Sequence, residues 1–250
     1  MFAPMSDGVT MDRRLAERNA PAGRPAMFQR WEDLLFLHWK FPTAEIQRTL
    51  PKGLTVDTFQ GDAWLGVVPF FMRAVRPAWL PPMPWFSYFL ELNLRTYVVD
   101  AQGRPGVWFY SLDCNRRMAV WLARTIFHLP YENAAMRADR SGTGIAYKSQ
   151  RRGADASSHF VYEPGSALDH ADPGSLEFFL VERYRLFARG PAGRLRSGRV
   201  HHAPYQLARA EVPAWRTDLF SLNGFEEPAR EPDHSVCSPG VSVNIYALGD

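Results

Sequence analysis

The sequence has few cysteines, few lysines and no long apolar run, and each shortage excludes a class of function. Cys114 and Cys237 are the only cysteines, and without C-x-x-C spacing they supply neither a disulfide framework nor a zinc ligand set. No apolar run reaches the roughly 20 residues that a membrane-spanning helix needs. The lysines are Lys40, Lys52 and Lys148 alone. The other cationic side chains are arginines, which cannot form an imine.

Several catalytic motifs are also missing. There is no G-x-S-x-G elbow, no Walker loop and no G-x-G-x-x-G, which disfavours serine hydrolases, P-loop enzymes and dinucleotide enzymes. There is no H-E-x-x-H, and the adjacent His201 and His202 point to opposite faces of any strand, so only one can enter a given pocket. We therefore expect no metal and no cofactor. The sequence leaves open which of the two histidines faces inward.

The composition is that of a globular protein with ample material for a core. The 250 residues are 46% hydrophobic and 22% charged, and the net charge of +3 is mild. A basic run from Arg183 to Arg199 is typical of a solvated hairpin, so we expect no nucleic-acid partner. Charged residues such as Asp12 and Arg13 interrupt the first 26 residues, which therefore do not resemble a secretory signal. We expect a cytoplasmic protein with no membrane partner.

Short alternating segments indicate an α+β fold dominated by antiparallel sheet. We predict a disordered or loosely packed arm over residues 1–26 and a single domain over 27–250. Strands are expected at residues 33–40, in a hairpin of 54–59 with 63–72, and over 176–189; helices are expected at 42–50 and from Asp113 to Phe127. Because no regular β-α-β alternation appears, we expect a curled or closed sheet with a few short helices.

The stretch from Glu91 to Val98 alternates strictly. Glu91, Asn93, Arg95 and Tyr97 share one face, while apolar side chains occupy most of the other. The polar face either is solvated or lines a wet pocket. If it lines a pocket, Arg95 can clamp a carboxylate and a desolvated Glu91 can act as an acid or base.

Two further features have both a structural and a functional reading. His128 ends a predicted helix, where the helix dipole favours a histidine without any catalytic role. The loop over residues 73–87 is apolar and rich in proline, so it either packs on the core or forms the lid of a pocket.

Five segments together resemble the YqjF-like family of bacterial proteins of unknown function, over about residues 28–248. They are Asn93 to Val98, Trp108 to Asp113, Phe127 to Tyr131, Arg199 to Ala210, and Pro232 to His234 with Ser238 to Val241. This family is placed near acetoacetate decarboxylase in fold. The resemblance implies a curled, cone-like antiparallel barrel with a central cavity.

The resemblance does not imply decarboxylase chemistry. Acetoacetate decarboxylase-like enzymes form an imine through a lysine, and an adjacent lysine lowers the pKa of its amine. The corresponding region here offers Arg116 and Arg117, and no lysine lies between Lys52 and Lys148. Lys40 lies in a segment that looks similar to the decarboxylase's early basic residue, and there the resemblance suggests that it binds a substrate carboxylate.

We therefore expect a small carboxylate or carbonyl compound in a central cavity. Glu91, His128 and His201 are the candidate catalytic residues, and Lys40, Arg95, Tyr97 and Tyr131 are the candidate ligand-binding residues. The alternatives are a non-catalytic ligand sensor or carrier, and a nucleic-acid binder supported by the arginine run alone. Whether the chain is an enzyme and whether it forms a homo-oligomer stay open.

Overall fold

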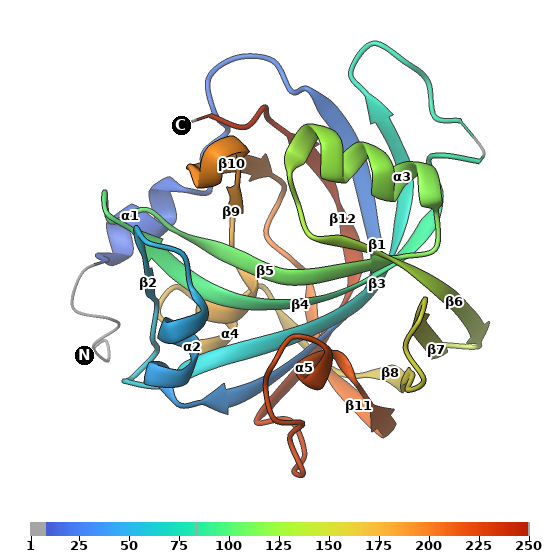
Figure 1. Ribbon diagram of the computed structural model, residues 1–250. Coiled ribbons are helices and arrows are strands. Elements are labelled where there is room, and N and C mark those ends of the chain that lie inside the picture. The colour runs from blue at the N-terminus through green and yellow to red at the C-terminus, as the bar shows by residue number, and fades with distance from the viewer. Residues whose placement is uncertain (1–8, 84, 250) are drawn as a thin grey trace.

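The computed structural model describes residues 9–83 and 85–249 (Figure 1). Its helices are α1 (Met11–Ala16), α2 (Thr43–Thr49), α3 (Arg117–Leu122), α4 (Leu176–Val181) and α5 (Leu219–Leu222), with a π-helical turn η1 (Ala123–Phe127) and a 3-10 turn η2 (Pro191–Gly193). Its strands are β1 (Met27–Phe41), β2 (Leu54–Val56), β3 (Ala63–Pro77), β4 (Phe89–Asp100), β5 (Pro105–Cys114), β6 (Tyr131–Ser141), β7 (Gly144–Arg151), β8 (Ser158–Asp169), β9 (Arg185–Arg189), β10 (Leu195–His201), β11 (Leu207–Arg216) and β12 (His234–Ile245).

All the described strands join one sheet that closes on itself twice. Its order is β10-β9-β5-β6-β7-β8-β11-β12-β1-β3-β4-β2, and β4 also pairs with β5 while β10 also pairs with β12. These closures form two adjoining rings. The first ring contains β12, β1, β3, β4, β5, β9 and β10; the second contains β6, β7, β8 and β11 and shares β12, β1, β3, β4 and β5 with the first. Apart from β5 with β6 and β5 with β9, the described pairings are antiparallel, which confirms the expected fold class.

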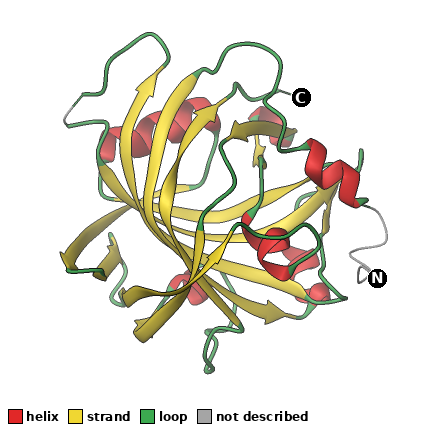
Figure 2. Cartoon of the chain, turned by 180° about the vertical axis from the view of Figure 1, so that it is seen from behind, coloured by secondary structure: helices red, strands yellow, loops and turns green. Residues whose placement is uncertain are grey.

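Of the shared strands, β3 and β4 bury both faces over most of their length, because one face points into each ring. Side chains alternate along β4, so Leu92 and Leu94 pack in the second ring beside Tyr147, whereas Phe89 and Tyr97 pack in the first. Figure 2 shows these long curved strands running through the middle of the molecule, with the helices around them. The polar face that begins at Glu91 therefore points into the first ring and away from solvent.

Two sequence-based expectations about the elements are wrong. Residues 54–56 do not form a hairpin with β3, because β1 and β4 occupy both edges of β3; β2 pairs with the end of β4 instead. Residues 176–181 form helix α4 and not a strand. The side-chain oxygen of Ser175 accepts a hydrogen bond from Phe178 N at 3.1 Å and caps this helix. A short run of buried apolar residues fits a helix as well as a strand.

The N-terminal segment also differs from the expected loose arm over the residues that the structure describes. Residues 1–8 lie outside them, but α1 forms a capped helix whose Arg14 is buried. Both terminal nitrogens of Arg14 donate to the carboxylate of Asp57 at 2.7 Å. An ion pair between residues far apart in the sequence produces no periodic pattern of apolar residues. The sequence pattern therefore could not predict that Arg14 holds α1 in place.

The helix expected after β5 begins later than the sequence suggests. Asp113 stays in β5, and α3 starts at Arg117 without a side-chain cap. The helix then widens into η1 and ends at His128, which has a left-handed backbone with φ of 50°. A π-helical turn is often found at functional sites. Here it lies beside the cavity described next.

Candidate functional site

A cavity of about 110 Å³ lies in the first ring, between β3, β4, β5 and the segment formed by α3 and η1. Its wall is almost wholly apolar, with Phe86, Phe89, Leu122 and Phe127 among the lining side chains. Of the described residues that line it, Glu91 carries the one formal charge. We call it the Glu91 cavity.

The Glu91 carboxyl is placed to exchange a proton near neutral pH. The side chain is buried, and the Tyr131 hydroxyl donates a hydrogen bond to its Oε2 at 2.6 Å. Burial raises the pKa of Glu91 to about 7, although hydrogen bonds from Tyr131 and Asn93 act in the opposite direction. A carboxyl with a pKa near the working pH can both give and take a proton efficiently.

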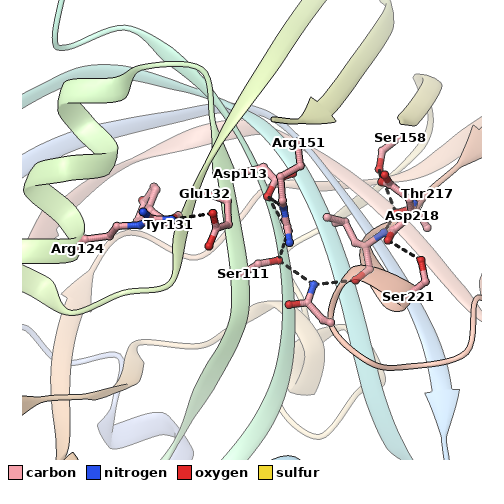
Figure 3. A network of polar contacts seen from close by, with 12 residues as sticks. Ser111, Asp113, Arg124, Tyr131, Glu132, Arg151, Ser158, Thr217, Asp218 and Ser221 are labelled. Carbon is pink, nitrogen blue, oxygen red and sulfur yellow. Dashed lines mark hydrogen bonds and ion pairs between the residues drawn. The ribbon is translucent and has the colours of Figure 1, made fainter. Parts of the chain in front are cut away.

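Tyr131 is held in place by its position at the start of β6. Pairing with Leu112 of β5 fixes its main chain, and Arg124 of η1 donates to its carbonyl oxygen. The same guanidinium reaches the carboxylate of Glu132 at 2.7 Å, as Figure 3 shows. Burial and the neighbouring Glu91 raise the pKa of Tyr131, so its hydroxyl stays protonated and remains a donor. The cavity wall is thereby tied to η1.

A second polar network in Figure 3 lies outside the cavity lining and connects strands. Arg151 of β7 pairs with Asp113 at 2.7 Å and donates to the Ser111 hydroxyl at 2.8 Å. The side-chain amide of Asn223 donates to the same hydroxyl at 2.9 Å. Burial raises the pKa of Asp113 to about 6 in spite of Arg151. This network joins β5, β7 and the end of α5.

Arg95 and Tyr97 share a face with Glu91 but do not line its cavity. Arg95 donates to the carbonyl oxygen of Leu180 at 3.2 Å, and its guanidinium lies over the Phe36 ring at 5.5 Å. The Tyr97 hydroxyl is 2.7 Å from Nε2 of His38. Both residues belong to a closely packed polar region beside α4.

Two histidines in that region were missed by sequence reasoning as candidate site residues. Nδ1 of His38 lies 3.0 Å from Nδ1 of His234, and Nε2 of His234 lies 3.8 Å from the carboxylate of Glu177. Burial lowers the pKa of both histidines, that of His234 to about 4. Two neutral rings can share this hydrogen bond only if one donates and the other accepts. The Pro232 to His234 motif was the one sequence signal for this pair.

The remaining candidates lie apart from the Glu91 cavity. Lys40 is exposed and pairs with Asp62, and the other two lysines are exposed as well. His128 lines a separate surface groove. Phe109 and Leu129 line both this groove and the Glu91 cavity, and so lie between the two. His201 pairs with Asn244 between β10 and β12 and is not among the cavity residues. Of the two adjacent histidines, His202 is the buried one, at 3% exposure.

His202 is enclosed by aromatic rings. Its ring centroid lies 4.6 Å from that of Tyr184 and 4.7 Å from that of Tyr205. In the part of the chain that the structure describes, no group of three histidine, cysteine, aspartate or glutamate side chains is arranged to hold a metal ion. Among those same residues, none of the helices has the length and apolar character needed to cross a membrane.

Comparison with known proteins places this chain in a family and a fold. The family model DUF2071, described as an uncharacterized conserved protein, matches residues 28–242. The uncharacterized protein YqjF of Bacillus subtilis (strain 168) is 38% identical over 225 residues, which cover 89% of this chain and 92% of YqjF.

Solved structures share the fold at low identity. Acetoacetate decarboxylase from Legionella pneumophila superposes with a TM-score of 0.62 at 11% identity, covering 94% of each chain. The enduracididine biosynthesis enzyme MppR, solved in complex with pyruvate, superposes with a TM-score of 0.62 at 11% identity, covering 92% of each chain. The predicted likeness to the acetoacetate decarboxylase fold is therefore confirmed.

Proposed function

The chain belongs to the DUF2071 family of uncharacterized conserved proteins, and we propose that it binds a small, mostly apolar carbonyl compound in the Glu91 cavity. In this proposal Glu91 exchanges a proton with the bound compound. One observation carries it: a single carboxyl, with a pKa raised to about 7, stands in the wall of an apolar cavity.

The lining of the cavity favours a carbonyl group over a free carboxylate. A protonated Glu91 can donate a hydrogen bond to a carbonyl oxygen. No arginine or lysine is among the described residues that line the cavity, so an anionic ligand would have no cation to balance it there. An apolar cavity of about 150 Å³ can hold benzene. We expect a ligand of about that size or smaller in this cavity of about 110 Å³.

The proposed chemistry is removal and return of a proton next to the carbonyl group. Ionised Glu91 takes a proton from the carbon beside the carbonyl, so the negative charge passes from the carboxylate to the enolate and the total charge in the cavity does not change. The protonated carboxyl then exchanges its proton with water and returns one to that carbon. The Tyr131 hydroxyl keeps the carboxyl in one orientation through its bond at 2.6 Å. No lysine is required, which agrees with the exposure of Lys40, Lys52 and Lys148.

Hydrogen exchange into deuterated water tests the proposal. Acetone, 2-butanone and cyclopentanone are incubated with the protein in D₂O, and proton NMR follows loss of the hydrogens next to the carbonyl. We expect the wild type to accelerate the exchange and Glu91→Gln to abolish the acceleration. Glu163→Gln, at an exposed carboxylate, is the matched control and should behave as the wild type.

The outcomes separate the alternatives. Thermal stabilisation by a ketone without any exchange would support a non-catalytic carrier. Equal exchange rates for the wild type and Glu91→Gln would remove Glu91 from the chemistry. A protein–ketone adduct trapped by borohydride would contradict the absence of a lysine imine.

A further inference from the structure

The large apolar side chains that the described structure exposes are concentrated in one place. The described residues expose seven such side chains, and six of them lie in the loop after β3 or in the segment formed by α3 and η1. These six are Trp79, Trp85, Tyr88, Met118, Trp121 and Ile126. The seventh, Leu222, lies in α5. We call the six the tryptophan face.

The two segments that carry the tryptophan face lie side by side. Nε of Arg116 donates to the carbonyl oxygen of Tyr88 at 3.3 Å, and the Asn115 side chain accepts from Leu90 N at 2.9 Å. In Figure 1 the green α3 and the loop after β3 stand next to each other at the top of the molecule. Trp79 is 80% exposed and Trp121 is 66% exposed. An apolar patch of this kind on a soluble protein marks an interaction site.

The inner sides of the same segments line the Glu91 cavity. Phe86 comes from the first segment, and Ala119 and Leu122 come from the second. The second segment is thus apolar on the side facing the cavity and again on the side facing solvent. Whatever covers its outer side lies directly over the cavity.

The charge around the face favours an anionic partner. Residues 73–90 and 115–128 contain no aspartate or glutamate, although the chain has 26 acidic residues. Five arginines lie in these stretches: Arg73, Arg76, Arg116, Arg117 and Arg124. Arg73 and Arg124 pair with Glu32 and Glu132 from other elements, whereas Arg116 and Arg117 are exposed.

A second copy of the chain fits this charge pattern poorly. A two-fold interface places each patch against its own counterpart, so it would bring the exposed Arg116 and Arg117 of both copies together, and the two stretches themselves supply no acidic residue to pair with them. Tryptophan and tyrosine side chains favour the headgroup level of a bilayer, and arginine is attracted to anionic lipids. The composition of the tryptophan face matches that environment.

We propose that the tryptophan face docks on the surface of an anionic lipid bilayer. The contact is peripheral and needs no membrane-spanning helix, and it departs from the sequence-based expectation of no membrane partner. Docking in this way lays the α3 and η1 segment between the bilayer and the Glu91 cavity. The proposal does not depend on the chemistry assigned to Glu91.

Vesicle co-sedimentation of the full chain tests the proposal. The vesicles are phosphatidylcholine alone or phosphatidylcholine with phosphatidylglycerol. We expect binding to the phosphatidylglycerol vesicles that weakens as salt increases, together with a blue shift of tryptophan fluorescence. The double variant Trp79→Ser with Trp121→Ser should lose roughly tenfold or more in affinity, because it removes two apolar anchors. Leu222→Ser is the matched control for an exposed apolar side chain elsewhere.

A charge reversal separates the lipid charge from simple apolar adhesion. Arg117→Glu should weaken binding to phosphatidylglycerol vesicles, whereas Arg152→Glu, at another exposed arginine, should not. Thermal melting checks that each variant is folded. Absence of vesicle binding by the wild type, or equal binding by wild type and double variant, overturns the proposal. Dimerisation in light scattering that the double variant abolishes, without vesicle binding, assigns the face to a second copy instead.

Discussion

Two buried carboxylates, Glu91 on β4 and Asp57 directly after β2, lie near opposite ends of β4 and have opposite surroundings. Glu91 lies near the start of the strand at an apolar cavity. Asp57 lies near its end, where its main-chain N–H donates to the carbonyl oxygen of Tyr97 at 2.9 Å. Both are nearly inaccessible to solvent, at 3% and 0% exposure. Burial therefore does not distinguish them.

Their charged neighbours do distinguish them. Burial alone would raise the pKa of Asp57, but Arg183 and Arg14 lower it below its usual value. The guanidinium of Arg183 donates to Asp57 at 2.8 Å and lies 4.3 Å from the Phe179 ring centroid. Glu91 has a hydroxyl and an amide as partners and no cation. One carboxylate beside β4 is thus suited to fixing structure, and the other, on β4 itself, is suited to proton exchange.

The largest expected effect comes from removing the charge of Asp57. Asp57→Asn leaves Arg14 and Arg183 buried without their counter-charge, and breaking a buried ion pair in this way typically costs about 3–5 kcal/mol. Urea denaturation at pH 7 measures the loss. Asp155→Asn, at an exposed aspartate, should change the free energy of unfolding very little. A loss equal to that of the control would mean that Asp57 does not anchor α1.

Glu91 should make the protein less stable as the pH rises. Its ordinary pKa of 4.5 rises to about 7 in the fold, so between these pH values the folded state binds the extra proton. The free energy of unfolding then falls with pH, by about 3 kcal/mol in total at 1.36 kcal/mol per unit. Below pH 4.5 and above pH 7 this contribution is constant.

Comparing Glu91→Gln with the wild type measures that dependence. The neutral amide removes the penalty, so the variant should gain stability relative to the wild type between pH 5 and 8. Asp57 has the opposite sign. Its folded pKa is lowered, so its stabilisation is present above its unfolded pKa of about 3.8 and is lost as the pH falls further. A flat difference between Glu91→Gln and wild type would show that Glu91 is ionised throughout.

Asp113 is an intermediate case that sharpens the comparison. It is buried like Glu91 but has one cation, Arg151, which lowers its pKa. Burial and the nearby Asp218 and Glu132 outweigh that cation and raise the pKa to about 6. Arg151→Gln should raise that pKa further and reduce stability by about 2 kcal/mol at pH 8. Carboxyl NMR titration and urea denaturation check the two effects. Arg152→Gln is the matched control, and an unchanged Asp113 pKa would show that Arg151 does not act on it.

The sequence predicted the fold class more accurately than it predicted which strands pair with each other. The strict alternation from Glu91 to Val98 correctly indicates a two-faced strand, and the helix at α2 is confirmed. The burial of both faces was not predicted, because it arises from two ring closures between distant strands. The contact between His38 and His234 has the same origin. These two residues are 196 positions apart in the sequence, and the pairing of β1 with β12 places them opposite each other.

The candidate site was predicted in part. Glu91 and Tyr131 meet at the cavity, although the sequence could not indicate that the Tyr131 hydroxyl donates a hydrogen bond to Glu91. Arg95 and Tyr97 share the face of Glu91 but lie four and six residues further on. At about 3.4 Å per residue, Arg95 is roughly 14 Å along the strand from Glu91. A shared face therefore does not mean a shared cavity.

Tyr131→Phe should give the smallest effect and the most direct test of the Glu91 site. It removes the hydroxyl that donates to the carboxyl, so the pKa of Glu91 should rise by about one unit and stability should fall by about 1 kcal/mol. Tyr147→Phe is the matched control, because its hydroxyl donates to the main-chain oxygen of Glu91 at 2.8 Å. The control should lose stability without moving the carboxyl pKa. If both variants shift that pKa equally, packing around Glu91 sets its proton affinity, and the Tyr131 hydroxyl does not.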